Sequence, residues 1–176
     1  MTFSIGQNVI EIEIRALNLL KKSISKVQFE KAVSYLYKTS GKIIISGIGK
    51  SGHIGSKISS TLSSIGSSSF FLHPSEANHG DLGMIKKEDC MILISNSGES
   101  SELLNLILFC KKIKIPIISI TSDVKSTLAK QSSAVLLIPK NVEACPLELA
   151  PTSSTTCTLV IGDALAITLL RKRKFT

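Results

Sequence analysis

The strongest constraint on this chain is a set of five short apolar runs, each closed by turn or helix-capping residues. They span residues 42–46, 68–72, 90–95, 117–121 and 134–138. Runs that are apolar on both faces are typical of strands buried inside a parallel sheet. Helical spacing of apolar residues surrounds them, at 7–38 with a break near Ser25, and at 51–64, 99–113, 124–131 and 153–171. This alternation predicts a doubly wound α/β domain that binds ligands beyond the carboxyl ends of its strands.

The length and net charge of the chain favour a one-domain globular protein and argue against a nucleic-acid-binding one. The chain has 176 residues, which is about one domain, and its 43% hydrophobic content is ordinary for a globular protein. Residues 171–174 supply half of the net charge of +8. Because no basic stripe with interleaved aromatic residues is present, we expect a small anionic ligand and no nucleic acid.

The cysteines, the N-terminal segment and the longest apolar run indicate the cellular compartment of the protein. The four cysteines are far apart in the sequence: Cys90, Cys110, Cys145 and Cys157. Without C-x-x-C spacing they predict reduced thiols in a cytoplasmic protein, with neither a disulfide framework nor a zinc site. Glu11 and Glu13 argue against a signal peptide. The apolar run 157–170 contains Asp163 and is shorter than the roughly 20 residues of a membrane span, so we expect a buried helix and no membrane partner.

The loop after the first predicted strand, ISGIGKSGHIG at 45–55, has the composition of a phosphate-binding turn. A triphosphate-binding loop needs glycine at position 44, where this chain has Ile44. A dinucleotide-binding turn needs an acidic residue near the end of the second strand, and none occurs before Glu76. The turn still directs backbone N–H groups and a helix N-terminus toward an anion. Its candidate ligands are Gly49, Lys50 and Ser51.

The loop after the third predicted strand is SNSGESSE, at 95–102. Its serines could be ordinary caps of the next helix, since their spacing to glutamate resembles a capping box. Four serines around one glycine exceed what capping requires, and hydroxyls donate to phosphate oxygens without bulk. The loop therefore predicts a site for a monophosphate without a nucleotide. Its candidate ligands are Ser95, Ser97, Gly98 and Ser100.

Several blocks resemble the arabinose 5-phosphate isomerases of the sugar isomerase (SIS) domain family. They are GIGKSGHIGSK, FFLHPSEANHGDLGMI, ISNSGESSE, EACPLELAPTSSTT and GDALA, and the resemblance runs from about residue 8 to the end. It implies a flavodoxin-like, three-layer fold with a five-stranded parallel sheet, and one SIS domain over 1–176 with N-terminal helices in 1–40. It also implies no cofactor or metal, and a homotetramer whose sites are shared between subunits.

The same resemblance implies the interconversion of D-ribulose 5-phosphate and D-arabinose 5-phosphate, the first step of Kdo synthesis for lipopolysaccharide. Such an aldose–ketose exchange passes through a cis-enediol: a base moves a proton between C1 and C2 while polarising groups stabilise the enediolate. We expect Glu102 or Glu143 as the base, with Glu99 and Glu148 as weaker candidates. His79, in a polar loop, is expected to open the ring or transfer a proton, and Lys50 to lie beside the phosphate or the enediolate. Four further residues are expected to lie next to the catalytic residues and support them: His53, Glu76, Thr152 and Ser153.

Family members continue beyond the position of Thr176 into a His-Pro-Gly-Gly segment, whose histidine serves a neighbouring subunit, and most then carry paired CBS domains. Residues 1–176 contain neither, so we expect the fold and phosphate binding from this chain but less than full activity. Two alternatives stay open. The chain could be a sugar-phosphate-binding module without catalysis, or another phosphosugar isomerase such as a 6-phospho-3-hexuloisomerase.

Overall fold

The computed structural model describes residues 2–140 and 143–174. Within them, five parallel strands form one sheet in the order β2-β1-β3-β4-β5. The strands are β1 (Ile43–Gly47), β2 (Ser69–Phe71), β3 (Cys90–Ile94), β4 (Ile117–Thr121) and β5 (Ala134–Leu137). This order is that of flavodoxin-like domains, in which the chain changes direction across the sheet between β1 and β3. The predicted doubly wound, five-stranded fold is confirmed.

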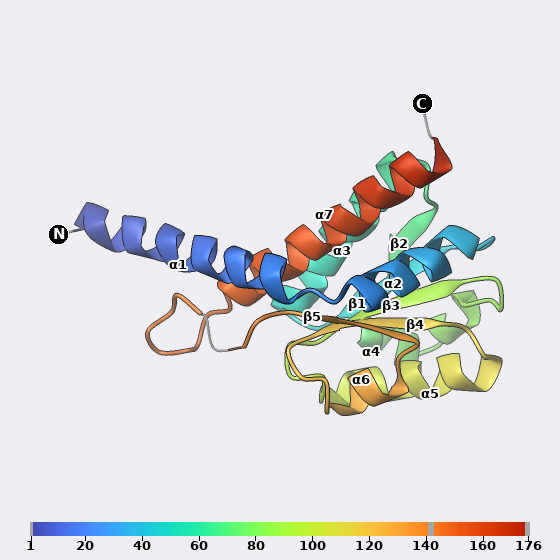
Figure 1. Ribbon diagram of the computed structural model, residues 1–176. Coiled ribbons are helices and arrows are strands. Elements are labelled where there is room, and N and C mark those ends of the chain that lie inside the picture. The colour runs from blue at the N-terminus through green and yellow to red at the C-terminus, as the bar shows by residue number, and fades with distance from the viewer. Residues whose placement is uncertain (1, 141–142, 175–176) are drawn as a thin grey trace.

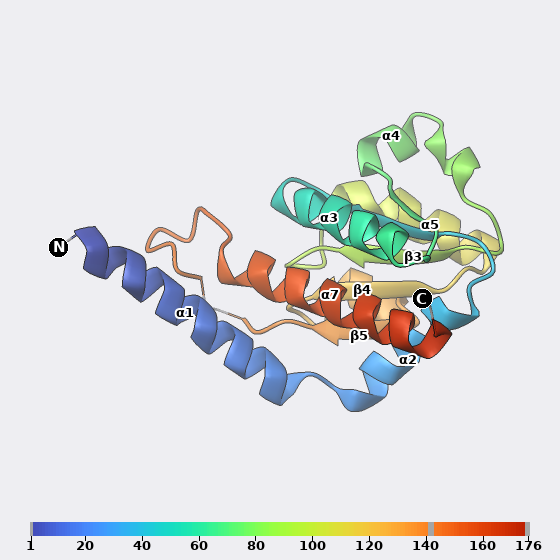
Figure 2. The ribbon, with the colours of Figure 1, turned by 90° about the horizontal axis from the view of Figure 1, so that it is seen from above.

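Helices cover both faces of the sheet, which gives three layers (Figures 1 and 2). One face carries α1 (Thr2–Ser23), α2 (Lys26–Lys38), α3 (Lys50–Ser64) and α7 (Ser153–Arg173). The other carries α4 (Pro74–Asn78), α5 (Leu104–Ile113) and α6 (Thr127–Gln131), together with the 3₁₀ turns η1 (Asp81–Met84) and η2 (Ser101–Leu103). The first half of α1 extends beyond the rest of the domain (Figure 2).

The central strand β3 shows why the apolar runs are continuous. Cys90, Ile92 and Ile94 pack toward α3 and α7, whereas Met91 and Leu93 pack toward α5. All five side chains are buried. Because successive side chains of a strand point to opposite faces, a strand covered on both sides must be apolar at every position.

Helix α7 is long and apolar enough to cross a membrane by length and composition, yet half of that stretch is buried inside the domain. It packs against α1, α2 and α3. Its contact with α3 is close, since a Cβ added to Gly162 would lie 2.4 Å from Cγ1 of the fully buried Ile58. The prediction that the run 157–170 forms a buried helix is confirmed.

The predicted break near Ser25 separates α1 from α2. The Ser25 side chain caps α2 by accepting the backbone N–H of Gln28 at 3.3 Å. The Gln28 side chain in turn accepts the backbone N–H of Val135 at 3.0 Å, on the outer side of the edge strand β5. A side chain of α2 therefore occupies a backbone donor of the sheet edge.

Two predicted helix starts and one predicted loop are wrong. The helix expected from 99 begins at Leu104, because Ser100 is extended and η2 comes first. The helix expected from 124 begins at Thr127, because Ser126 caps it by accepting the N–H of Ala129 at 3.2 Å. The α4 and η1 turns lie in a segment expected to be loop; α4 has Pro74 at its start, where proline favours a helix.

We predict that alanine has opposite effects at two helical glycines. Gly162→Ala should lower the free energy of unfolding by about 1–2 kcal/mol, because crowding against Ile58 exceeds the gain in helix propensity. Gly6→Ala in α1, where nothing lies within 4 Å, should raise it by up to about 1 kcal/mol. Urea unfolding measures both changes, and stabilisation by Gly162→Ala would contradict the close packing of α3 on α7.

Candidate functional site

The two predicted phosphate loops begin side by side. Gly47, the last residue of β1, is in register with Ile94, the last residue of β3. A Cβ at Gly47 would lie 3.0 Å from the Ile94 carbonyl oxygen, and one at Gly52 would lie 2.8 Å from that of Gly47. Glycine at position 47 thus lets the end of β1 lie close to β3, and glycine at position 52 lets α3 pack closely on the end of β1.

The turn leads directly into the N-terminus of α3. Gly49 is the N-cap, with a φ of +57° that favours glycine, and α3 begins at Lys50. The first turn contains no acidic residue, and Lys50 is exposed. A cation at the positive end of a helix dipole is unfavourable unless an anion compensates both. Gly49, Lys50 and Ser51 thus lie where the sequence predicted an anion site.

The serine loop is folded around the buried hydroxyl of Ser95. That oxygen accepts the backbone N–H of Gly98 at 3.1 Å and lies 2.8 Å from the Ser100 hydroxyl. Gly98 has a φ of +70°, and an added Cβ would lie 2.1 Å from the Ser126 hydroxyl. Ser97 is exposed and accepts the backbone N–H of Glu99 at 3.2 Å. Ser95 and Ser100 shape the loop, whereas Ser97 presents its hydroxyl outward.

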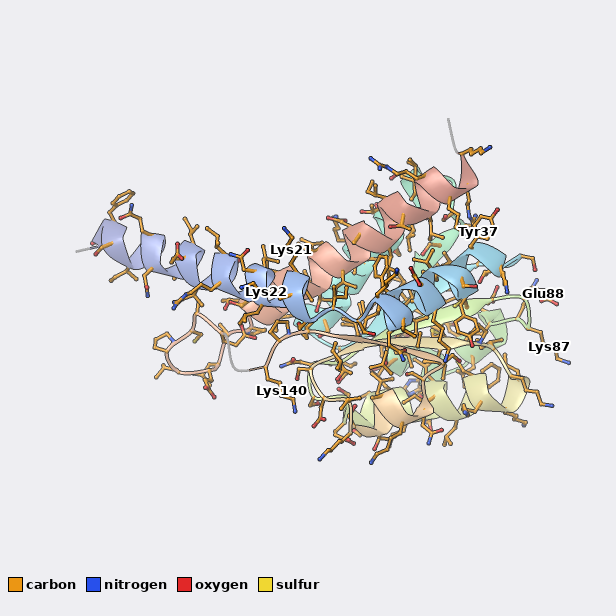
Figure 3. The ribbon with its side chains drawn as sticks, viewed as in Figure 1. Lys21, Lys22, Tyr37, Lys87, Glu88 and Lys140 are labelled. Atoms are coloured by element: carbon orange, nitrogen blue, oxygen red, sulfur yellow. The ribbon has the colours of Figure 1, made fainter. Side chains whose placement is uncertain are left out.

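A pocket of about 750 Å³ opens beside Ser97, at the carboxyl ends of β3, β4 and β5. Most of its polar lining comes from the three loops that follow these strands, among them Ser97, Glu99, Asp123, Lys140, Glu143 and Glu148, and Ser154 of α7 adds to it. Figure 3 shows Lys140 at the opposite end of the domain from Lys87 and Glu88, which precede β3. The pocket therefore lies where a doubly wound sheet binds ligands.

Glu143 caps helix α7. Its carboxylate accepts the backbone N–H of Thr152 at 2.7 Å, the Thr152 hydroxyl at 2.9 Å and the N–H of Ser154 at 3.3 Å. Partial burial raises the pKa of Glu143, but the hydrogen bonds from Ser154 and Thr152 together outweigh it and hold the pKa below its ordinary value. Thr152 occupies the N-cap position without capping through its own side chain. Ser153 is buried, and its hydroxyl has no hydrogen-bond partner among the described residues.

The other predicted side chains lie outside the pocket wall. Glu102 is exposed in the 3₁₀ turn η2, ahead of α5, and accepts the Ser101 hydroxyl at 3.2 Å. His79 ends α4, with its Nδ1 2.8 Å from the Ser75 carbonyl oxygen. Two further candidates are exposed on helices, His53 on α3 and Glu76 on α4.

The structure adds pocket residues that the sequence did not single out. Lys140 forms an ion pair with Asp123 at 3.1 Å across the ends of β4 and β5. Cys145 lines the pocket, and backbone N–H groups of residues 147–150 lower the pKa of its thiol. By contrast, burial raises the pKa of Cys90 and of Cys110 to about 12. All four cysteines are free thiols, as predicted.

Together, these features define an α/β domain whose two glycine- and serine-rich loops lie at its topological switch point. The chain belongs to the SIS domain family, whose family model matches residues 35–168. It is 53% identical over 167 residues to the arabinose 5-phosphate isomerase KdsD of Francisella tularensis, covering 93% of this chain and 51% of that protein. The KdsD of Salmonella typhi is 50% identical over 171 residues, covering 97% and 52%. The chain spans about half the length of the curated relatives it matches.

A solved structure is also closely similar. It is that of the protein c3406 of E. coli CFT073 in complex with arabinose 5-phosphate. It superposes with a TM-score of 0.94 at 39% identity, over 99% of this chain and 93% of that one. This agreement covers both candidate loops and the segment that lines the pocket.

We predict that Glu143 makes stability depend on pH. Because its pKa is lowered in the folded state, its contribution is present above the unfolded value of 4.5 and is lost as the pH falls through the lowered pKa. At pH 7, Glu143→Gln should lower the free energy of unfolding by about 1 kcal/mol, through loss of the charged cap. Denaturation measured from pH 7 to pH 3 tests this, with the exposed Glu102→Gln as a control that changes little.

We also predict that Cys145 is the most reactive thiol. Iodoacetamide at pH 8 should modify it first, because thiolates react and the other three cysteines are buried. Peptide mass spectrometry over time identifies the site, and Cys145→Ser should remove the fast phase. Faster labelling of Cys157 would contradict this arrangement.

Proposed function

We propose that the protein is an aldose–ketose isomerase that interconverts D-ribulose 5-phosphate and D-arabinose 5-phosphate through a cis-enediol intermediate. One observation carries this proposal: a helix start without acidic residues and a serine loop lie side by side, next to a pocket that holds carboxylates. The anion-binding edge suits the phosphate, and the pocket offers groups for proton transfer. The names of the curated relatives and the arabinose 5-phosphate complex of the solved structure support the same reaction.

The phosphate would lie between the start of α3 and the serine loop. Gly49 and Gly98 allow the backbone to approach it, Ser51 and Ser97 donate hydroxyls, and Ser95 and Ser100 hold the serine loop in shape. Lys50 supplies the positive charge. Because the phosphate is remote from C1 and C2, its binding energy orients the sugar without entering the proton transfer.

Proton transfer would be performed from the pocket wall. A base takes the proton from C2 of the aldose and returns it to C1, while the hydroxyl proton moves from O2 to O1. Of the two predicted glutamates, Glu143 lines the pocket, which favours it over Glu102. The hydrogen bonds that lower the pKa of Glu143 keep it ionised, as a base must be at neutral pH. His79 would assist ring opening.

The remaining proposals concern the domain organisation, cellular compartment, pathway and oligomeric state of the protein. We propose a single cytoplasmic SIS domain over 1–176 that supplies Kdo synthesis and assembles as a homotetramer with shared sites. Large apolar side chains of the extended half of α1 support association, since Phe3 is 77% exposed and Ile10 61% exposed. So does the pocket segment, where Leu147 and Leu149 are 72% and 79% exposed. Light scattering during gel filtration measures the assembly.

The reaction is tested by incubating the protein with ribulose 5-phosphate and following arabinose 5-phosphate by NMR. The assay is run on residues 1–176 and on a chain extended through the downstream histidine that the family resemblance implies. Product from the extended chain alone would mean that this histidine is required. The absence of product from both would contradict the proposed function.

We predict that Ser97→Ala weakens binding of both arabinose 5-phosphate and inorganic phosphate by about tenfold, through loss of a hydrogen bond to a charged group. Isothermal titration calorimetry measures both affinities. Ser60→Ala, an exposed serine of α3, is the matched control and should leave them unchanged. If Ser97→Ala also leaves both affinities unchanged, the phosphate is not bound at the serine loop.

A further inference from the structure

Four carboxylates line the pocket, and three of them already serve the fold. Glu99 accepts the backbone N–H of Thr127 at 2.7 Å and so holds the start of α6. Asp123 pairs with the Lys140 ammonium at 3.1 Å. Glu143 caps α7 through its contacts with residues 152 and 154. These three groups have structural partners before any ligand arrives.

Glu148 is the fourth carboxylate, and its side chain has no structural partner. Across residues 2–140 and 143–174, its carboxylate forms no hydrogen bond or ion pair, and the side chain is exposed at the pocket. Only the backbone is fixed, because the Glu148 N–H donates to the Cys145 carbonyl oxygen at 3.0 Å. This turn therefore presents a free acceptor to the same cavity that Ser97 lines.

The backbone at this position favours a different residue. Glu148 has a φ of +52°, in the left-handed region that glycine enters freely and L side chains adopt with strain. Glycine at this position would therefore adopt the turn with less backbone strain than glutamate. A glutamate at a strained position that borders a pocket indicates that its side chain has a use there.

We infer that Glu148 is a substrate-binding residue whose carboxylate accepts hydrogen bonds from the hydroxyl groups of the sugar phosphate. The inference rests on the proposed function and adds a determinant of specificity to it. Hydrogen bonds from hydroxyls to a carboxylate are charge-assisted and strong. The same negative charge repels a bare phosphate ion. Glu148 therefore favours a polyhydroxylated phosphate over inorganic phosphate.

This selectivity predicts opposite effects of a Glu148 substitution on the binding of the two ligands. In calorimetric titrations, Glu148→Gly should bind arabinose 5-phosphate about tenfold more weakly, and inorganic phosphate equally well or more tightly. Glu148→Gln keeps the size and one acceptor oxygen, so it should lose less affinity for the sugar phosphate. The melting temperature of Glu148→Gly should not fall below that of the wild type, because glycine relieves the strain.

Lys114→Gly is the matched control. Lys114 has a similar φ of +61° but ends α5, outside the pocket wall, so both affinities should stay unchanged. Unchanged binding of arabinose 5-phosphate by Glu148→Gly, or an equal loss for both ligands, would overturn the inference and leave the proposed function intact. A wild-type protein that binds neither ligand would overturn the proposed function, and this inference with it.

Discussion

The parallel pairing of β1 with β3 is the contact on which the site depends. Its register runs from Ile43 opposite Cys90 to Gly47 opposite Ile94, so both strands end at the same level. The loops that follow must then start next to each other, and small residues are needed where they meet. The approach of Gly47 to the Ile94 carbonyl shows how little space is left. The closeness of the two candidate phosphate loops is thus a consequence of strand register.

The helices that begin at this edge differ in the charge at their N-termini. The N-terminus of α6 is held by Glu99, and that of α7 by Glu143. Both helix dipoles are therefore already compensated by carboxylates of the chain itself. The start of α3 carries Lys50 and no acidic side chain in its first turn. Of these three helix starts, only that of α3 has no carboxylate bound to its backbone among the described residues, which is why we propose it as the place for the phosphate.

The sequence predicted the fold well because strands covered on both faces must be continuously apolar. It also placed the two glycine- and serine-rich loops after β1 and β3, and their role in binding phosphate stays a prediction. It could not predict how Glu143 is used, because the backbone donors of α7 reach it only through tertiary folding. Nor could it predict that Glu99 accepts the backbone N–H of Thr127 at the start of α6, because the two residues are 28 apart in the sequence. Cys145 carried no sequence signal and Glu148 only a weak one, because amide contacts to a thiol and a left-handed backbone leave no pattern in composition.

The hydrogen bond between Gln28 and Val135 has a consequence for solubility. Edge strands expose backbone groups that can recruit a strand from another molecule. At β5 the amide side chain from α2 takes one of these donors and covers part of that edge. The other edge, β2, has only three residues, which is too short for extensive pairing. The two ends of the sheet thus offer few backbone groups to a second molecule, and at β5 a single glutamine of α2 removes one of them.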